Sequence, residues 1–109
     1  MGETRLYVAQ RVSALILAPL VLAHLGLIVT AVRGGLSAAE ILARTHDSPI
    51  WAGFYGLFVV AAAVHGSIGL RAVAAETLGW RGRGLVWAIL AIGLALLALG
   101  LRAVVAVIA

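Results

Sequence analysis

The sequence predicts an all-α membrane protein with three transmembrane helices, and three observations lead to this fold class. Of the 109 residues, 64 % are hydrophobic and only 11 % are charged, whereas soluble domains average about 25 % charged residues. The mean hydropathy of the chain is +1.17. The charged residues lie between three long uncharged stretches, each near the roughly 20 residues that a helix needs to cross a bilayer.

The first predicted span covers residues 12–32, between two arginines. It carries His24 and lacks the small-residue cleavage site of a secretory signal, so we expect it to be retained as a helix. A Ser-Ala-Ala-Glu run follows at residues 37–40, which is the pattern of a capping box. This run predicts a short amphipathic helix over residues 37–44.

The second predicted span covers residues 50–73, with Ser48 as N-cap and Pro49 at the first helical position. The third covers residues 84–105 and contains Arg102. An arginine near the end of a span can extend its side chain to the interface, so Arg102 is compatible with a spanning helix. The whole chain thus forms one transmembrane domain.

The arginines set the expected orientation. Of the eight, five lie on the N-terminal side and in the second loop, and three lie in the first loop and near the C-terminus. Because cytoplasmic segments carry more positive charge, we expect the N-terminus in the cytoplasm. The net charge of +4 indicates topology and contact with anionic lipid rather than nucleic acid, because the arginines stand singly at the ends of apolar runs. The chain has no cysteine, so it cannot ligate an iron–sulfur cluster through thiolates.

Polar side chains inside apolar spans are the candidates for function. His65 lies between small residues on its helix face, and these neighbours let a flat group approach closely. A neutral imidazole there can be an axial ligand of haem iron. The alternative is a hydrogen bond to a carbonyl of a neighbouring helix. The residues expected on this face are Phe58, Ala61, His65, Gly69, Ala72 and Glu76.

His24 is equally open to both interpretations. At about 1.5 Å per residue it lies about 18 Å from the inner end of the first span, whereas His65 lies about 8–10 Å from the inner side. The two side chains are therefore not expected to bind one iron within one chain. Each pairs with a histidine of a partner, or only one of them is a ligand. His46, beside Asp47 in a loop, is expected to be solvated.

Five polar residues are expected near one another at the inner membrane face, at about the depth of His65. An arginine there marks topology by default, but its guanidinium also matches a haem propionate or polarises a quinone carbonyl. These residues are Tyr7, Arg11, Ser13, Arg71 and Glu76.

Two motifs resemble those of a known family. The run from His65 to Arg71, followed by Glu76, has the form H-x-x-x-G-x-R-x-x-x-x-[DE]. It resembles the second-helix signature of the membrane-anchor cytochrome b subunits of succinate dehydrogenase and fumarate reductase. The run at residues 10–14, Gln-Arg-Val-Ser-Ala, is similar to the first-helix motif of that family, H-R-x-S-G. With three spans, the resemblance covers nearly the whole chain.

The resemblance implies a non-catalytic subunit of a multi-pass complex in the bacterial inner membrane. His65 would bind the iron of haem b together with a histidine of a second membrane-anchor subunit. Arg11 would lie at the quinone site and the propionates, with Ser13 and Tyr7 nearby and Glu76 beside the quinone pocket. A flavoprotein and an iron–sulfur subunit would dock on the inner face. His24 has an analogue in members with two haems, so a second haem iron at His24 is also considered.

The chain departs from the family pattern at four positions. Gln10 stands where histidine is common, Ala14 replaces a glycine, Tyr7 stands where a serine is often found, and Thr77 follows Glu76 where one anchor type has a tyrosine. These departures leave open which of the two anchor subunits the chain resembles.

Two other functions compete with this one. In a haem-free structural subunit, both histidines would serve only as hydrogen-bonding groups between helices. A small multidrug exporter would have four spans and a glutamate within the first, and here the first span holds no acid. A stand-alone enzyme is not expected, because the sequence shows no nucleophile–base pair, metal cluster or phosphate loop.

Overall fold

The structure, a computed structural model, describes residues 2–35 and 37–109. Its helices are α1 (Glu3–Gly34), α2 (Ala38–Thr45), α3 (Pro49–Leu78) and α4 (Arg83–Ile108), and the described residues contain no strand. α1, α3 and α4 are each long and apolar enough to cross a membrane. The predicted all-α fold with three spanning helices is therefore confirmed.

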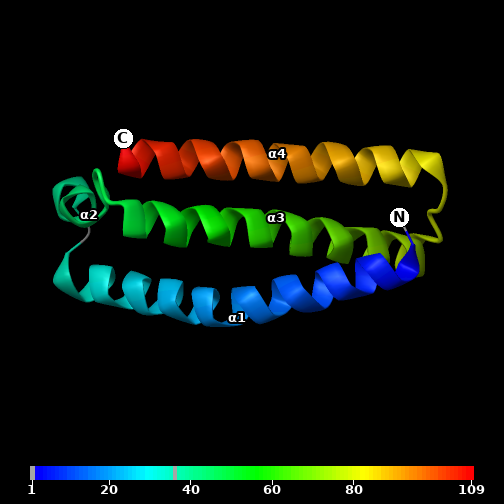
Figure 1. Cartoon of the computed structure of the whole chain (residues 1–109), viewed down its shortest axis with the longest axis horizontal. Helices are drawn as coiled ribbons and strands as arrows, with labels where there is room; N and C mark the ends of the chain where they lie inside the picture. Colours follow the sequence, from blue (N-terminus) through cyan, green and yellow to red (C-terminus); the bar gives the residue numbers. More distant parts are fainter. Residues whose placement is uncertain (1, 36) are drawn as a thin grey trace.

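The three long helices lie side by side, with α3 in the middle (Figure 1). α3 packs against both α1 and α4, but α1 and α4 do not pack against each other within the described ranges. The short α2 packs on α3 and α4 near the C-terminus, and the chain begins at the opposite end, beside the turn between α3 and α4 (Figure 1). The longest dimension is 47 Å, which is close to the thickness of a bilayer with its headgroups.

This arrangement leaves little of the chain buried. The buried apolar side chains are Ala61, Ala63 and Leu85, and large apolar side chains on all three long helices are exposed. In water such a surface would be strongly unfavourable. In a membrane such a surface is covered by lipid, because lipid chains are as apolar as these side chains.

The helices are longer than the uncharged stretches. α1 begins at Glu3, nine residues before the predicted span, and α3 continues to Leu78. Charge marks where a helix leaves the hydrocarbon, but it does not end the helix, because Arg, Gln and Glu are good helix formers. α3 ends where Gly79 adopts a left-handed φ of 65°, which a glycine allows without steric cost. α1 bends near its middle (Figure 1), where Pro19 interrupts the hydrogen-bond ladder.

Both predicted helix caps form. The Ser37 hydroxyl accepts a hydrogen bond from the Glu40 N–H at 3.1 Å and starts α2. The Ser48 hydroxyl accepts one from the Trp51 N–H at 3.3 Å, with Pro49 at the start of α3. The capping side chains satisfy amide donors that have no partner inside the helix. The two caps thereby fix where α2 and α3 begin.

Two glycines allow α3 and α4 to approach closely. A Cβ built on Gly93 would lie 2.6 Å from the Ser67 Oγ, and one built on Gly100 would lie 2.5 Å from a Val59 methyl carbon. Real Cβ atoms do not come so close to other heavy atoms, so α4 occupies this position only because both residues lack a side chain. Small residues at helix contacts are the usual means of close packing in membranes.

The loop before α3 caps the carboxyl end of α4. Thr45, whose exposed fraction is 0 %, donates from Oγ1 to the Val107 carbonyl at 2.7 Å and lies 3.0 Å from the Ile41 carbonyl. The Asp47 N–H donates to the Ile108 carbonyl at 2.8 Å. These bonds satisfy carbonyls that the last turn of a helix leaves without partners. They join α2 to α4, far apart in sequence.

Replacing Thr45 with valine should destabilise the fold by about 1–3 kcal/mol, because it keeps the volume but removes the bond from the buried Thr45 hydroxyl to the Val107 carbonyl. The free energy of unfolding in detergent micelles, followed by circular dichroism during titration with sodium dodecyl sulfate, measures the loss. The matched control is Thr30→Val, since the Thr30 hydroxyl bonds only to the Gly26 carbonyl of its own exposed helix turn. Equal effects of the two substitutions would rule out a role for the bond to α4.

Candidate functional site

His65 and Ser13 meet between α3 and α1. The Ser13 Oγ lies 3.3 Å from the His65 Nδ1, and the same hydroxyl donates to the Gln10 carbonyl at 3.0 Å. Ser13 is buried and His65 is half-buried. The structure thus brings together two of the residues singled out from the sequence, although they are 52 positions apart.

The Ser13 hydroxyl can hold His65 in one tautomer. A serine hydroxyl has one proton, and its oxygen lies within hydrogen-bonding distance of both the Gln10 carbonyl and the His65 Nδ1. When the proton is donated to the Gln10 carbonyl, the Ser13 Oγ accepts from an Nδ1–H of His65, and the Nε2 atom keeps its lone pair. Within residues 2–35 and 37–109 the Nε2 atom has no hydrogen-bond partner. Metal-bound histidines commonly have this arrangement, in which one ring nitrogen donates to the protein and the other binds the metal.

The surroundings of His65 are small and contain an unpaired acceptor. Gly69 lies one turn further along α3, and the Gln10 amide packs 3.6 Å from where a Gly69 Cβ would stand. The Gln10 Oε1 is buried without a partner in the described part of the chain. Sequence reasoning quoted Gln10 only as part of a motif. Its place one turn before Ser13 on α1 was the signal that it faces the same site.

His24 lies nearer the other end of α1 and faces the aromatic side chains at the start of α3. Its ring meets Phe58 edge-on at 5.1 Å between centroids and Tyr55 edge-on at 6.1 Å. Its Nδ1 is buried and has no partner among the described residues. A buried imidazole nitrogen without a hydrogen bond is unfavourable, so this nitrogen is available to a ligand.

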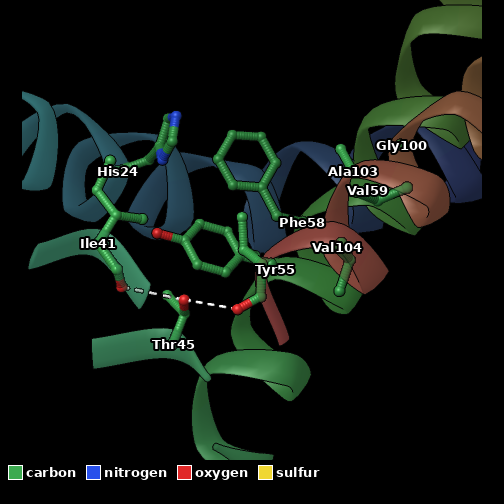
Figure 2. A pocket seen from close by; sticks show the side chains of 10 residues that line it. His24, Ile41, Thr45, Tyr55, Phe58, Val59, Gly100, Ala103 and Val104 are labelled. Carbon is green, nitrogen blue, oxygen red and sulfur yellow. Dashed lines mark hydrogen bonds between the residues drawn. The ribbon is translucent and has the colours of Figure 1, made fainter. Parts of the chain in front are cut away.

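An apolar cavity of about 370 Å³ adjoins His24. Figure 2 shows His24, Tyr55 and Phe58 on one side of it and Ile41 with Thr45 of α2 on another. The Thr45 hydroxyl is already occupied by its bonds to backbone carbonyls (Figure 2). The polar atoms that remain for an occupant are therefore few. The lining is completed by Val59, Gly100, Ala103, Val104 and Val107.

The two histidines lie at different depths. His65 contacts residue 13 of α1, and His24 is eleven residues further along the same helix, a rise of about 16 Å. The sequence-based expectation that the two do not bind one iron together agrees with this spacing. His46 is exposed, with its Nε2 3.2 Å from the Asp47 Oδ2, as expected for a solvated loop histidine.

The predicted polar group at the inner end is divided between two surfaces. Arg71 and Glu76 of α3 line a cavity that also includes Glu3, and the Arg71 Nη2 lies 3.9 Å from the Glu3 Oε1. Tyr7 and Arg11 pair with each other on the exposed side of α1, with the guanidinium 5.7 Å from the ring centroid. They do not line that cavity.

The division follows from helix geometry. Tyr7 and Arg11 are four residues apart and share one face of α1, whereas Ser13 faces α3. Glu3 was not among the sequence candidates, because nothing in a lone acid near the N-terminus indicates that it meets Arg71. Within the described residues, no group of three or more His, Asp or Glu side chains converges to hold a metal ion. A metal bound by His65 would need further ligands from a cofactor or another chain.

Three long apolar helices, a short helix that closes one end and a histidine held between two spans define a small multi-pass membrane subunit. The chain belongs to the succinate dehydrogenase/fumarate reductase transmembrane subunit family, whose model matches residues 3–107. The family resemblance found in the motifs is thereby confirmed. Comparisons with curated proteins and with solved structures gave no significant match.

Proposed function

We propose that this chain is the cytochrome b anchor of a succinate dehydrogenase or fumarate reductase complex. It would bind haem b through His65 and form part of the site where electrons pass between iron–sulfur clusters and quinone. The single observation that carries the proposal is the His65–Ser13 pair. When the Ser13 proton is donated to the Gln10 carbonyl, the Ser13 Oγ accepts the Nδ1–H of His65 and leaves Nε2 free to bind iron.

Haem b, when bound, would supply one-electron redox chemistry between the soluble clusters and the membrane. The residues of this chain would have distinct roles. His65 binds through Nε2, and Ser13 holds the ring in place through Nδ1. Arg11, whose guanidinium is exposed on α1, is free to pair with a propionate or to hydrogen-bond a quinone carbonyl. Glu76 is proposed to hold a proton near the quinone.

The complex requires further chains. A flavoprotein would oxidise or reduce the dicarboxylate, an iron–sulfur subunit would carry the electrons to the membrane, and a second anchor subunit would supply the other axial histidine. The need for a second anchor is supported by the packing of α1 and α4 on α3 but not on each other, which leaves large apolar side chains exposed on all three long helices. A haem site in a helix bundle uses about four helices. We place the complex in a bacterial inner membrane, with the N-terminus in the cytoplasm.

His24 is the candidate for a second haem, and the observation that favours it is its buried Nδ1, which lies beside an apolar cavity and has no partner in the described part of the chain. The number of haems per copy of the chain tests this assignment. Two haems, falling to one in His24→Leu, would assign the second to His24. One haem per complex, unchanged in His24→Leu, would leave His24 as a packing residue.

The experiment that tests the proposal is a reduced-minus-oxidised spectrum of the detergent-purified complex, with haem measured per copy of this chain. We expect a b-type absorption band and co-purification of flavin and iron–sulfur subunits. A complex with those subunits but without haem would make the chain a haem-free anchor. A chain that purifies without them would contradict the proposal as a whole.

Quinone reduction should depend on Arg11. We expect Arg11→Leu to slow quinone reduction by about 10–100-fold, because a hydrogen bond to a charged group contributes about 1.5–3 kcal/mol. The rate of electron transfer to a soluble dye should be unchanged, because the dye accepts electrons from the soluble subunits before they reach the quinone site. The matched control is Arg33→Leu at the other end of α1. If Arg11→Leu reduces quinone at the wild-type rate, Arg11 is only a marker of topology.

A further inference from the structure

We propose that the cavity between the end of α3 and the start of α4 binds a phosphate group, such as that of an anionic phospholipid. The cavity has a volume of about 500 Å³. Its charged lining comes from the first turn of α1, the last turns of α3, and the turn into α4. The lining residues used here are Glu3, Arg71, Glu76, Arg81, Arg83 and Leu85.

The charges of this cavity favour an anion. The lining includes three arginines and two glutamates, and within the described residues the one ion pair between them is the long Arg71–Glu3 contact at 3.9 Å, in which the Glu3 side chain is 91 % exposed. Arg81 and Arg83 make no ion pair with any described residue. Two guanidinium groups at one cavity therefore remain available, and each presents several N–H donors with the geometry that phosphate oxygens accept.

The start of α4 adds to this positive potential. Its N-cap is Gly82, which has no side chain to cap the helix, and its first turn carries no acid. The first amide groups of α4 therefore lack intrahelical partners, and the helix dipole directs positive charge toward this end. The helix end supports the site, but the two free arginines and the cavity define it.

The depth of the cavity matches the headgroup region of a bilayer. Trp80 and Trp87 flank it in sequence and are 43 % and 70 % exposed, and the Trp80 indole packs against Gly84 at the start of α4. Tryptophans of membrane proteins gather at the headgroup level. The lining also contains Leu85, which is 3 % exposed. A cavity lined by both arginines and apolar side chains suits an amphiphile with a phosphate at its head.

The test is a titration of the purified complex with short-chain phosphatidylglycerol, with bound lipid counted by native mass spectrometry. The variant is Arg81→Ala with Arg83→Ala, which spares the residues proposed for haem and quinone. Its dissociation constant should rise about fivefold per arginine, or roughly 25-fold for the pair. The control is Arg33→Ala with Arg44→Ala, which removes the same charge at the opposite end and should change the constant less than twofold.

A second arm distinguishes the sources of the phosphate. If millimolar inorganic phosphate displaces the lipid from the wild-type complex, the site takes free phosphate; if it does not, and binding still depends on Arg81 and Arg83, the occupant is a lipid headgroup. Equal loss of binding in both double variants would overturn the proposal, because the effect would then be one of net charge. The proposal would also be overturned if the Arg81→Ala, Arg83→Ala variant kept the lipid but lost another subunit on purification. The arginines would then bind an acidic protein surface.

Discussion

The substitution His65→Ala should remove one haem and its b-type absorption from the complex while leaving the chain inserted and helical. The imidazole Nε2 is the atom proposed to bind the iron, and alanine has no group that can replace it. The loss should approach one full haem per copy of the chain. It is measured by the reduced-minus-oxidised spectrum, together with haem extraction from the same sample.

Two further variants separate ligation from general damage. His46→Ala removes an exposed histidine that pairs with Asp47 and should leave the band unchanged. Ser13→Ala removes the hydrogen-bond partner of the His65 Nδ1 and should keep the haem but shift its reduction potential, because the hydrogen bond tunes the basicity of the ligand. An unchanged spectrum in His65→Ala would reject the ligand assignment.

The substitution Gly100→Ala should destabilise the packing of α3 on α4 by about 1–3 kcal/mol. The new Cβ would lie 2.5 Å from one Val59 methyl and 3.0 Å from the other, and a β-branched side chain in a helix has almost no alternative rotamer. The helices must therefore move apart. The free energy of unfolding in detergent, measured as for Thr45, reports the loss.

Gly26→Ala is the matched control, because nothing lies within 4 Å of a Cβ at that position of α1. It should be neutral or stabilising by up to about 1 kcal/mol, since alanine is the better helix former. Gly93→Ala should cost less than Gly100→Ala, because the Ser67 hydroxyl in its way can rotate. If Gly26→Ala and Gly100→Ala have the same effect, helix propensity alone explains both.

The sequence predicted the local features well because each rests on nearby residues. The caps at Ser37 and Ser48 and the short helix between them depend on side chains three or four positions apart. The face of α3 that carries His65 and Gly69 also follows from helix periodicity, and these residues do face α1. Pairings across helices were harder to foresee. The Arg71–Glu3 contact and the bond from Thr45 to Val107 join segments distant in the chain, and no local pattern specifies them.

The sequence by itself determined the class of the protein and its candidate ligands. Hydropathy and helical periodicity are properties of the chain, so three spans and two intramembrane histidines follow from composition and spacing. Only the tertiary structure decided which partner each histidine has. It gave His65 the Ser13 hydroxyl and left the His24 Nδ1 without a partner among the described residues, because the neighbours of a buried polar atom depend on how the helices are placed against one another. For α1 and α3 that placement includes close contacts such as the Gln10 amide against Gly69, where packing across two helices sets their separation.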